Sequence, residues 1–386
     1  MNFDVHVDRV AAGGDGLGTA PDGRVVFVPT SVPGDHLSIE VTQTKKSFYR
    51  GRIIDVLAPG PTRVDPPCVH VGQGCGGCDW QHVSVEGQRQ LRVDLVRDAV
   101  RRIAKIDDLD VGHGPALDAD GYRTTVRAAV LQGRGGFRMR RSNRVLVPDH
   151  CLVAHPQIDE LLTSVDFGAA EEVVLRVGAR TGDEMVHVLS GGTNLDLPED
   201  VVLSTEGTPG AITEIVAGHR FRISGPSFFQ CRPDGAEAMV ALVAEAIGMV
   251  EGPLIDAYAG VGLFGAILGA DRPLTSVEVA GSSVADSRHN LPDHAVIVET
   301  PVEEWTPTPA AAVVADPARA GLGRDGADVI SGTGADVIAL VSCDVASMAR
   351  DVALLSERGY HPDWARVLDL FGHTSHVEVV TRLIRT

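Results

Sequence analysis

A cysteine stands at the end of an apolar run near the C-terminus, in Ile338-Ala339-Leu340-Val341-Ser342-Cys343-Asp344. Four successive apolar residues, followed by helix-forming sequence from Ala346 to Glu357, predict a buried parallel strand with a thiol at its carboxyl edge. Ligands of open α/β sheets bind at that edge. Cys343 is therefore a candidate nucleophile, although a free cysteine is more often a packing residue of the core.

Two acidic residues are predicted to join this thiol. The run from Ala311 to Ala315 predicts another buried strand, which ends in Asp316 at the same edge of the sheet. Glu378 enters the otherwise apolar run that continues as Val379-Val380, so its carboxylate is expected to be partly buried with a raised pKa. The alternative for Glu378 is a paired structural acid, because a glutamate is seldom buried without a partner.

A glycine turn predicts a nucleotide-like ligand. Leu254-Ile255-Asp256-Ala257-Tyr258-Ala259-Gly260-Val261-Gly262 is typical of a strand followed by a glycine turn and a helix. Glu278 ends the next predicted strand, where an acid accepts hydrogen bonds from ribose hydroxyls. The third glycine of the dinucleotide fingerprint is absent, which favours S-adenosylmethionine over NAD.

Four cysteines predict a metal centre. Cys68, Cys75 and Cys78 have the spacing Cys-x6-Cys-x2-Cys with glycines between them, and Cys151 supplies the fourth thiolate. Four thiolates suit either a [4Fe–4S] cluster or structural zinc. Zinc sites usually use paired Cys-x2-Cys knuckles, so one pair with two single ligands favours the cluster.

Two stretches are candidates for contact with the substrate. Ser224-Gly225-Pro226-Ser227-Phe228-Phe229-Gln230 presents rings and an amide before a helix, so that a planar base could stack on Phe228; the alternative is an aromatic core with a helix cap. Residues 121–144 carry seven arginines and no acid, within a hairpin that is predicted over residues 121–149 with its turn at 133–136. This indicates either a polyanion site or a solvated face. The arginines are Arg123, Arg127, Arg134, Arg138, Arg140, Arg141 and Arg144.

The composition sets the class of protein that must position these residues. The 386 residues suffice for two or three domains, and no stretch is long and apolar enough for a membrane span. The N-terminus lacks a signal-peptide pattern, which indicates a cytoplasmic protein with reduced thiols. The net charge of −18 argues against a nucleic-acid partner except at local basic patches.

Three domains are expected, in a multidomain α/β fold. Residues 1–57 read as short strands with glycine turns, typical of an OB-like barrel, with Lys45 and Lys46 beside Phe48 and Tyr49 as an RNA-binding cluster. Residues 58–225 are expected to form a small α+β domain with the cluster loop, a helix over 85–106 and the basic hairpin. Residues 226–386 predict a Rossmann-like methyltransferase domain.

The order of these motifs resembles a known family. The stretch from Gly14 to Gly51 is similar to a TRAM domain, an RNA-binding barrel, and the chain as a whole resembles the RNA uracil-5 methyltransferases. The combination of a TRAM-like barrel with cluster cysteines resembles the 23S ribosomal RNA branch, although some cluster-bearing relatives modify transfer RNA. The motifs are the four cysteines, Phe228-Phe229-Gln230, Asp256-x-Tyr258-x-Gly260-x-Gly262, Asp316-Pro317-Ala318-Arg319-Ala320-Gly321, Ser342-Cys343-Asp344 and His373-Thr374-Ser375-His376-Val377-Glu378.

The resemblance implies roles for these residues. Cys343 would add to carbon 6 of uracil and Glu378 would remove the carbon-5 proton, which is covalent catalysis followed by general-base catalysis. Gln230, Tyr258, Gly260, Gly262, Glu278 and Asp316 would surround S-adenosyl-L-methionine. Phe228, Asp316, Arg123, Arg127, Arg138, Arg140, Lys45 and Lys46 would contact RNA, with ribosomal RNA favoured over transfer RNA. A monomer that binds no membrane is expected.

The sequence departs from the family pattern at several positions. The first cysteine gap is one residue longer than usual, Arg232 replaces an asparagine, and Val345 and Gly372 replace prolines. Three alternatives therefore stay open: a methyltransferase for uridine 54 of transfer RNA, a non-catalytic RNA-binding iron–sulfur protein, and a small-molecule methyltransferase.

Overall fold

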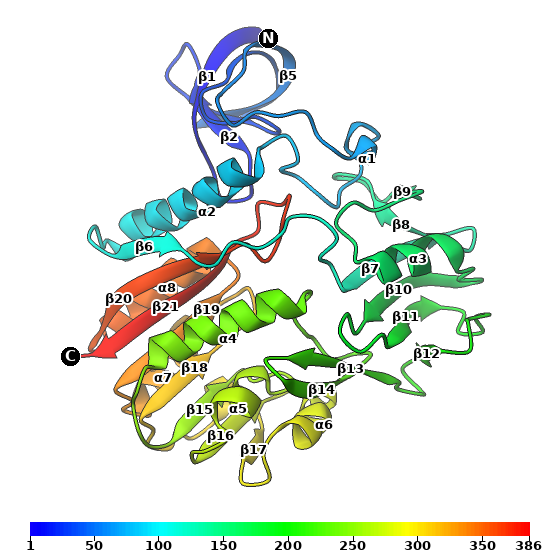
Figure 1. The fold of residues 1–386 in the computed structure, drawn as a ribbon. Helices are drawn as coiled ribbons and strands as arrows, with labels where there is room; N and C mark the ends of the chain where they lie inside the picture. The colour runs from blue at the N-terminus through cyan, green and yellow to red at the C-terminus, as the bar shows by residue number, and fades with distance from the viewer.

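The N-terminal residues form a closed five-stranded barrel, drawn in blue in Figure 1. The computed structural model describes residues 1–386. The strands are β1 (Asn2–Val10), β2 (Gly16–Thr19), β3 (Val25–Val28), β4 (His36–Thr44) and β5 (Phe48–Ala58), in the order β1-β2-β3-β5-β4. The expected barrel is confirmed. Tyr49 was wrongly predicted as a stacking ring, because it is buried in the barrel core and its hydroxyl donates to Asp22.

The segment after the barrel crosses to the C-terminal part of the molecule. It contains α1 (Val69–Gly72), α2 (Val85–Ala99), the π-helical turn η1 (Val100–Ala104) and β6 (Asp110–His113). Ser84 caps α2 by accepting from the amide of Gly87, and the helical segment ends where Lys105 adopts a left-handed φ of 60°. β6 pairs in parallel with β20. Part of the range 58–225 therefore belongs to the layers of the C-terminal sheet.

A six-stranded sheet carries the basic hairpin (Figure 1). Its order is β12-β11-β10-β7-β8-β9, with α3 (Pro156–Ser164) packed against it. The strands are β7 (Thr125–Leu131), β8 (Arg134–Arg138), β9 (Val145–Leu146), β10 (Ala170–Val177), β11 (Glu184–Gly191) and β12 (Val201–Ser204). The turn of the hairpin consists of Gln132 and Gly133, whereas the sequence predicted a turn over 133–136. Both residues have positive φ, which allows Leu131 to pair directly with Arg134.

The hairpin of β13 (Ala211–Val216) and β14 (His219–Ser224) leads into a large sheet of eight strands. The order of that sheet is β17-β16-β15-β18-β19-β21-β20-β6. Its remaining strands are β15 (Leu254–Ala257), β16 (Leu274–Glu278), β17 (Val296–Glu299), β18 (Ala312–Ala315), β19 (Val337–Ser342), β20 (Tyr360–Leu368) and β21 (Glu378–Arg385). The Rossmann-like architecture that the sequence predicts for this part of the chain is confirmed.

Helices cover both faces of this sheet (Figure 1). Alternate residues of β19 face opposite ways: Ile338 and Leu340 pack with α2 and α8, while Ala339 and Val341 pack with α4. The helices are α4 (Pro233–Ile247), α5 (Leu263–Leu268), α6 (Gly281–Asn290), the 3₁₀ turn η2 (Val302–Glu304), α7 (Gly323–Gly332) and α8 (Val345–Ser356). Burial on both faces explains why these strands are continuous apolar runs.

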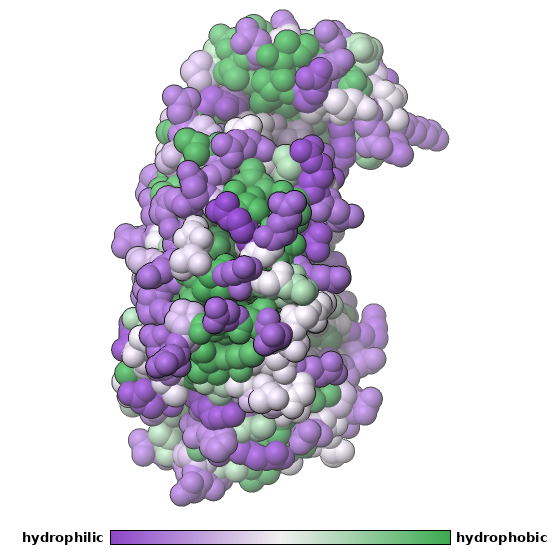
Figure 2. Space-filling view, turned by 90° about the vertical axis from the view of Figure 1, so that its right-hand side faces the viewer, coloured by the Kyte–Doolittle hydropathy of each residue, from purple (hydrophilic) through white to green (hydrophobic).

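The surface is mixed in polarity. Figure 2 shows hydrophobic side chains in the middle of one face, interrupted by hydrophilic ones, and an outline that is indented below the barrel. No helix has the length and apolar character needed to cross a membrane.

Candidate active site

The reversed direction of β21 brings Glu378 beside Cys343. β15, β16, β17, β18 and β19 are parallel, whereas β21 runs antiparallel to β19, with Ser342 paired to Val379. The first residue of β21 therefore lies at the same edge as the last residues of the parallel strands. Cys343 directly follows β19, and Asp316 directly follows β18, so that three reactive side chains share one edge.

Burial and neighbouring carboxylates disfavour the thiolate form of Cys343. Burial, followed by the charges of Glu378 and Asp316, raises the pKa of Cys343 to about 11, while Arg319 opposes the rise. The carboxylate of the next residue, Asp344, caps α8 by accepting from the amides of Ala346 and Ser347. Desolvation is therefore the main influence on the thiol.

Glu378 is buried and Asp316 is partly buried, and the charge of Asp316 acts on the Glu378 carboxyl. Burial raises the pKa of Asp316 to about 7, and burial together with the charge of Asp316 raises that of Glu378 well above its usual range. Two nearby carboxylates in a low-dielectric site disfavour joint ionisation. An acid of this kind is a strong base once it has lost its proton.

The glycine turn after β15 is held by Glu278. Gly260 and Gly262 have φ angles of 56° and 91°, which only glycine adopts readily. The amide of Gly260 donates to Oε2 of Glu278 at 2.7 Å, and Oε1 accepts from the amides of Val279 and Ala280. The hydroxyl of Tyr258 donates to Glu303 at 2.7 Å. The turn and the acid thus form one rigid wall of the site.

One cavity of about 730 Å³, the catalytic cavity, joins the thiol to this wall. A volume of this size matches the pockets that hold cofactor-sized ligands. Of the residues predicted from the sequence, its lining includes Arg123, Phe228, Gln230, Tyr258, Gly260, Glu278, Asp316, Cys343 and Glu378. Gly262 lies just behind the lining, at the start of α5.

Phe228 and Phe229 differ sharply in exposure. The Phe228 side chain is 70% exposed, whereas Phe229 is 6% exposed and packs against Phe221. Gln230 is also buried. The core alternative therefore holds for Phe229 and not for Phe228, whose ring lies at the border of two cavities.

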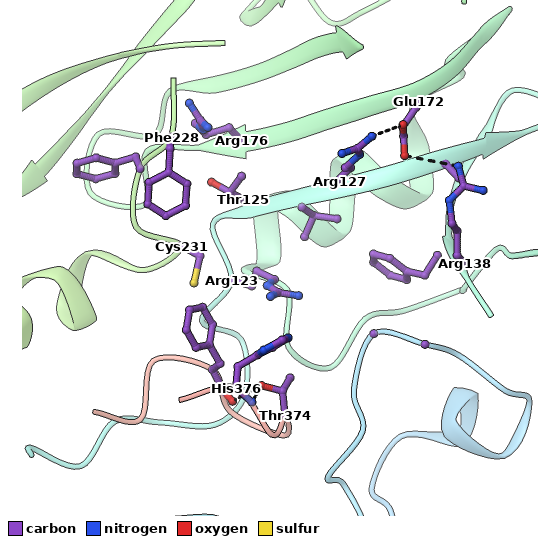
Figure 3. A pocket seen from close by; sticks show the side chains of 17 residues that line it. Arg123, Thr125, Arg127, Arg138, Glu172, Arg176, Phe228, Cys231, Thr374 and His376 are labelled. Atoms are coloured by element: carbon purple, nitrogen blue, oxygen red, sulfur yellow. Dashed lines mark hydrogen bonds and ion pairs between the residues drawn. The ribbon is translucent and has the colours of Figure 1, made fainter. Parts of the chain in front are cut away.

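The second of these cavities is a basic groove of about 680 Å³ (Figure 3). Arg123, Arg127 and Arg138 line it, and Phe228 and His376 belong to both the groove and the catalytic cavity. Glu172 on β10 lies 2.6 Å from Arg127 and 3.7 Å from Arg138, which partly neutralises the arginines. This acid lies outside the basic stretch in sequence, so the charge pattern alone did not show it.

The other predicted cations lie elsewhere. Arg140 lines a separate polar cavity of about 240 Å³ between the barrel and the loop before β21, and donates to the carbonyl of Cys78. Lys45 and Lys46 are exposed at the end of the β4–β5 hairpin and line none of these cavities.

Sequence reasoning gave no role to His376, Arg319 or Arg176, of which Arg176 lines the basic groove. His376 lines the catalytic cavity, the basic groove and the polar cavity, and its Nδ1 lies 3.1 Å from Nη2 of Arg319. Burial lowers its pKa, and the charge of Arg319 adds to this effect. The motif His376-Val377-Glu378 was the one available signal for this position.

The four cysteines predicted to bind metal meet at one place. Cys68, Cys75, Cys78 and Cys151 all line a cavity of about 30 Å³, the thiol cavity. The amide of Gly77 donates to the sulfur of Cys75 at 3.5 Å. No three His, Cys, Asp or Glu side chains are grouped closely enough to hold a single metal ion. The donor set fits a thiolate-bound group, but its arrangement is not that of a preformed single-ion site.

The chain is similar to known proteins along its whole length. Residues 2–54 match the TRAM domain family. The whole chain is 32% identical to a Streptomyces coelicolor protein described as an uncharacterized RNA methyltransferase, and the match covers 99% of this chain and 92% of that protein. A Corynebacterium efficiens protein of the same description is 33% identical, over 97% and 93%.

Among solved structures, the Pyrococcus abyssi tRNA (uracil-54, C5)-methyltransferase in complex with S-adenosyl-L-homocysteine has the same fold. Its TM-score is 0.77 at 24% identity, and the match covers 98% of this chain and 100% of that one.

Proposed function

The chain belongs to the family of RNA methyltransferases, and we propose that it transfers a methyl group from S-adenosyl-L-methionine to carbon 5 of a uridine in RNA. One observation carries the proposal: Cys343, Glu378 and Asp316 meet at one sheet edge, in the cavity that the glycine turn after β15 also lines. A thiol, a buried carboxylate and a donor site in a shared cavity are what methylation of an unreactive pyrimidine carbon requires.

The proposed reaction begins with the thiolate of Cys343. Its sulfur bonds to carbon 6 of uracil, and the electron pair of the carbon 5–carbon 6 double bond moves to make carbon 5 an enolate carbon. Carbon 5 then takes the methyl group from the sulfonium, which leaves as S-adenosyl-L-homocysteine. Covalent addition of this kind divides one difficult step into two easier ones.

Release of the product requires a base. In the proposed second half, Glu378 takes the proton from carbon 5, the double bond re-forms, and the carbon 6–sulfur bond breaks to restore the thiolate. The raised pKa of Glu378 supports this role, because a basic carboxylate at the operating pH removes a proton more readily. Asp316, which is partly buried and lines the same cavity, would hydrogen-bond to the uracil or to the methyl donor.

The substrate would reach the cavity as an unstacked nucleotide. A base inside a helix cannot enter so enclosed a site, so the target uridine must leave its stack. The exposed ring of Phe228 would stack on the extruded uracil, and the groove with Arg123, Arg127 and Arg138 would hold the adjoining phosphates. The barrel would bind RNA further from the target.

We also propose that Cys68, Cys75, Cys78 and Cys151 hold a [4Fe–4S] cluster, with zinc as the alternative. Their shared cavity supports a thiolate-bound group, and such a cluster would tie the hairpin region to the segment that follows the barrel. Iron and acid-labile sulfide analysis of anaerobically purified protein distinguishes the two metals. Stoichiometric zinc without iron would contradict the cluster.

The proposed target is 23S ribosomal RNA, and transfer RNA, the substrate named for the Pyrococcus abyssi protein, is the alternative. The test uses purified protein, radiolabelled S-adenosyl-L-methionine and transcripts of both RNA classes, with methylated positions mapped by mass spectrometry. We expect 5-methyluridine in the 23S transcript, and 5-methyluridine in transfer RNA alone would support the alternative instead. Methylation of neither class, or of a position other than carbon 5 of uridine, would contradict the proposal.

A further inference from the structure

The loop 369–377, which we call the catalytic loop, connects β20 to Glu378 and also carries His376. Its position decides where the proposed base begins its strand. The loop has no regular secondary structure, so side chains from elsewhere must hold it. Three parts of the chain do so: α2, the segment around Asp79, and residues 120–122, where Tyr122 donates to the carbonyl of Gly372 and Asp120 bonds to the ring of His373.

Helix α2 holds the inner side of the catalytic loop. Arg92 is 2% exposed and donates to the carbonyls of Phe371, Thr374 and His376. It also pairs with Asp369 at 3.1 Å. A buried guanidinium with this many acceptors is part of the folded core, and its removal would leave several carbonyls without donors.

The segment of the thiol-cavity cysteines holds the other side. Asp79 directly follows Cys78, a thiol-cavity residue, and its two carboxylate oxygens accept from one residue of the loop. The amide of Ser375 donates to Oδ1 at 2.8 Å, and the Ser375 hydroxyl donates to Oδ2 at 2.6 Å. The amide of Trp80 then donates to the carbonyl of His373 at 2.9 Å.

The barrel meets the same point. The indole nitrogen of Trp80 donates to the carbonyl of Gly14 at 3.2 Å. A Cβ on Gly14 would lie only 2.8 Å from Ser375, so the barrel turn and the catalytic loop are in close contact. Asp79 itself lines the polar cavity together with Thr374 and His376. It is thus a partly accessible, charge-assisted contact, unlike the buried Arg92.

We propose that Asp79 is a positioning residue that fixes the catalytic loop, and through it Glu378, for abstraction of the carbon-5 proton. This role rests on the proposed function. Cys343 stands at the end of β19 and is not part of the loop, so its addition to carbon 6 does not depend on Asp79. Loosening the loop should therefore slow release of the covalent intermediate more than its formation.

The prediction is specific to one step of the reaction. When Asp79→Ala removes both acceptors, Ser375 loses two hydrogen bonds and Glu378 is less well placed. Misplacement of a catalytic group by about 1 Å costs roughly 100-fold in rate, so we expect release to slow by about 10- to 100-fold. The enzyme–RNA adduct should then accumulate on ordinary uridine substrate and resist denaturing electrophoresis.

Asp79→Asn serves as the conservative variant. It keeps an oxygen acceptor for the Ser375 amide, and its own amide group can donate to the Ser375 hydroxyl. It should recover most of the release rate. Ser375→Ala, which keeps the backbone bond and loses only the hydroxyl, should slow release by less than Asp79→Ala does. Asp65→Ala, at an exposed aspartate of the same connecting segment, is the matched control and should behave as wild type.

The experiment follows formation and release of the adduct by rapid quench in single turnovers of the full-length proteins. Thermal unfolding and S-adenosyl-L-methionine affinity are measured alongside. Slow release with adduct formation within about twofold of wild type would support the role of Asp79. Equal slowing of both steps, or wild-type release in both Asp79→Ala and Ser375→Ala, would overturn it. Wild-type protein that makes no 5-methyluridine would instead overturn the proposed function itself.

Discussion

The neighbouring rings of Phe228 and Phe229 allow stability and substrate binding to be separated. Because Phe228 is 70% exposed, truncation to alanine removes little buried surface and should change the free energy of unfolding by less than about 0.5 kcal/mol. Phe229 is 6% exposed and lies 5.7 Å from Phe221, ring centre to ring centre. Its truncation should cost about 3–5 kcal/mol.

The effects on activity should follow the opposite order. Stacking of one base on an aromatic ring contributes about 1–3 kcal/mol, which corresponds to roughly 5- to 150-fold in kcat/KM for RNA. Phe228→Ala should lose activity by this factor with unchanged stability, and Phe228→Trp should retain most of it. Phe229→Ala should mainly lower the unfolding temperature.

The assay measures kcat/KM with RNA, affinity for S-adenosyl-L-methionine and chemical unfolding for all three variants. Two results would refute the reasoning. One is a loss of more than about 2 kcal/mol of stability in Phe228→Ala, a loss typical of a buried side chain. The other is a kcat/KM of Phe228→Ala within twofold of wild type, which would show that the exposed ring does not stack on the substrate.

Three further predictions concern charge and the thiols. Burial raises the pKa of Glu378, so the stability that its protonated form contributes is lost as pH rises above the unfolded-state pKa of about 4.3. The unfolding temperature of Glu378→Gln should therefore increase relative to that of wild type between about pH 5 and 8. A difference in unfolding temperature that does not change with pH would contradict this. Glu172→Gln should tighten RNA binding, whereas Arg127→Ala should weaken it. For a single-stranded site, Arg127→Ala should also reduce the slope of log affinity against log salt concentration by about 0.7. Binding titrations measure both effects, and unchanged affinity in both variants would argue against RNA binding in the groove. Cys151→Ser should lose bound iron, whereas Cys231→Ser, at a cysteine that does not line the thiol cavity, should keep it. Equal iron content in the two variants would exclude Cys151 as a ligand.

The predictable parts of the molecule are those in which local sequence determines structure. β18 and β19 are buried on both faces, so each is an uninterrupted apolar run, and the polar residues that follow them, Asp316 and Cys343, mark the ligand-binding edge. The glycine turn was recognisable because Gly260 and Gly262 need positive φ. The barrel showed its strands through alternating residues and turn signals.

The features that sequence did not show depend on contacts between distant residues. The short strand β6, Asp110-Val111-Gly112-His113, has no distinctive pattern and forms only because β20 offers it an edge. Glu172 neutralises arginines of two other strands, and Asp79 binds Ser375 almost three hundred residues away. Charge and spacing along the chain give no information on such pairs.

The covalent intermediate on Cys343 tests the central claim most directly. Wild-type protein is incubated with S-adenosyl-L-methionine and RNA that contains 5-fluorouridine, in which fluorine at carbon 5 blocks the proton abstraction that would release the enzyme. We predict a stable one-to-one enzyme–RNA adduct that mass spectrometry locates at Cys343 and that Cys343→Ala does not form. Absence of the adduct in wild type, or 5-methyluridine formation by Cys343→Ala, would contradict the account.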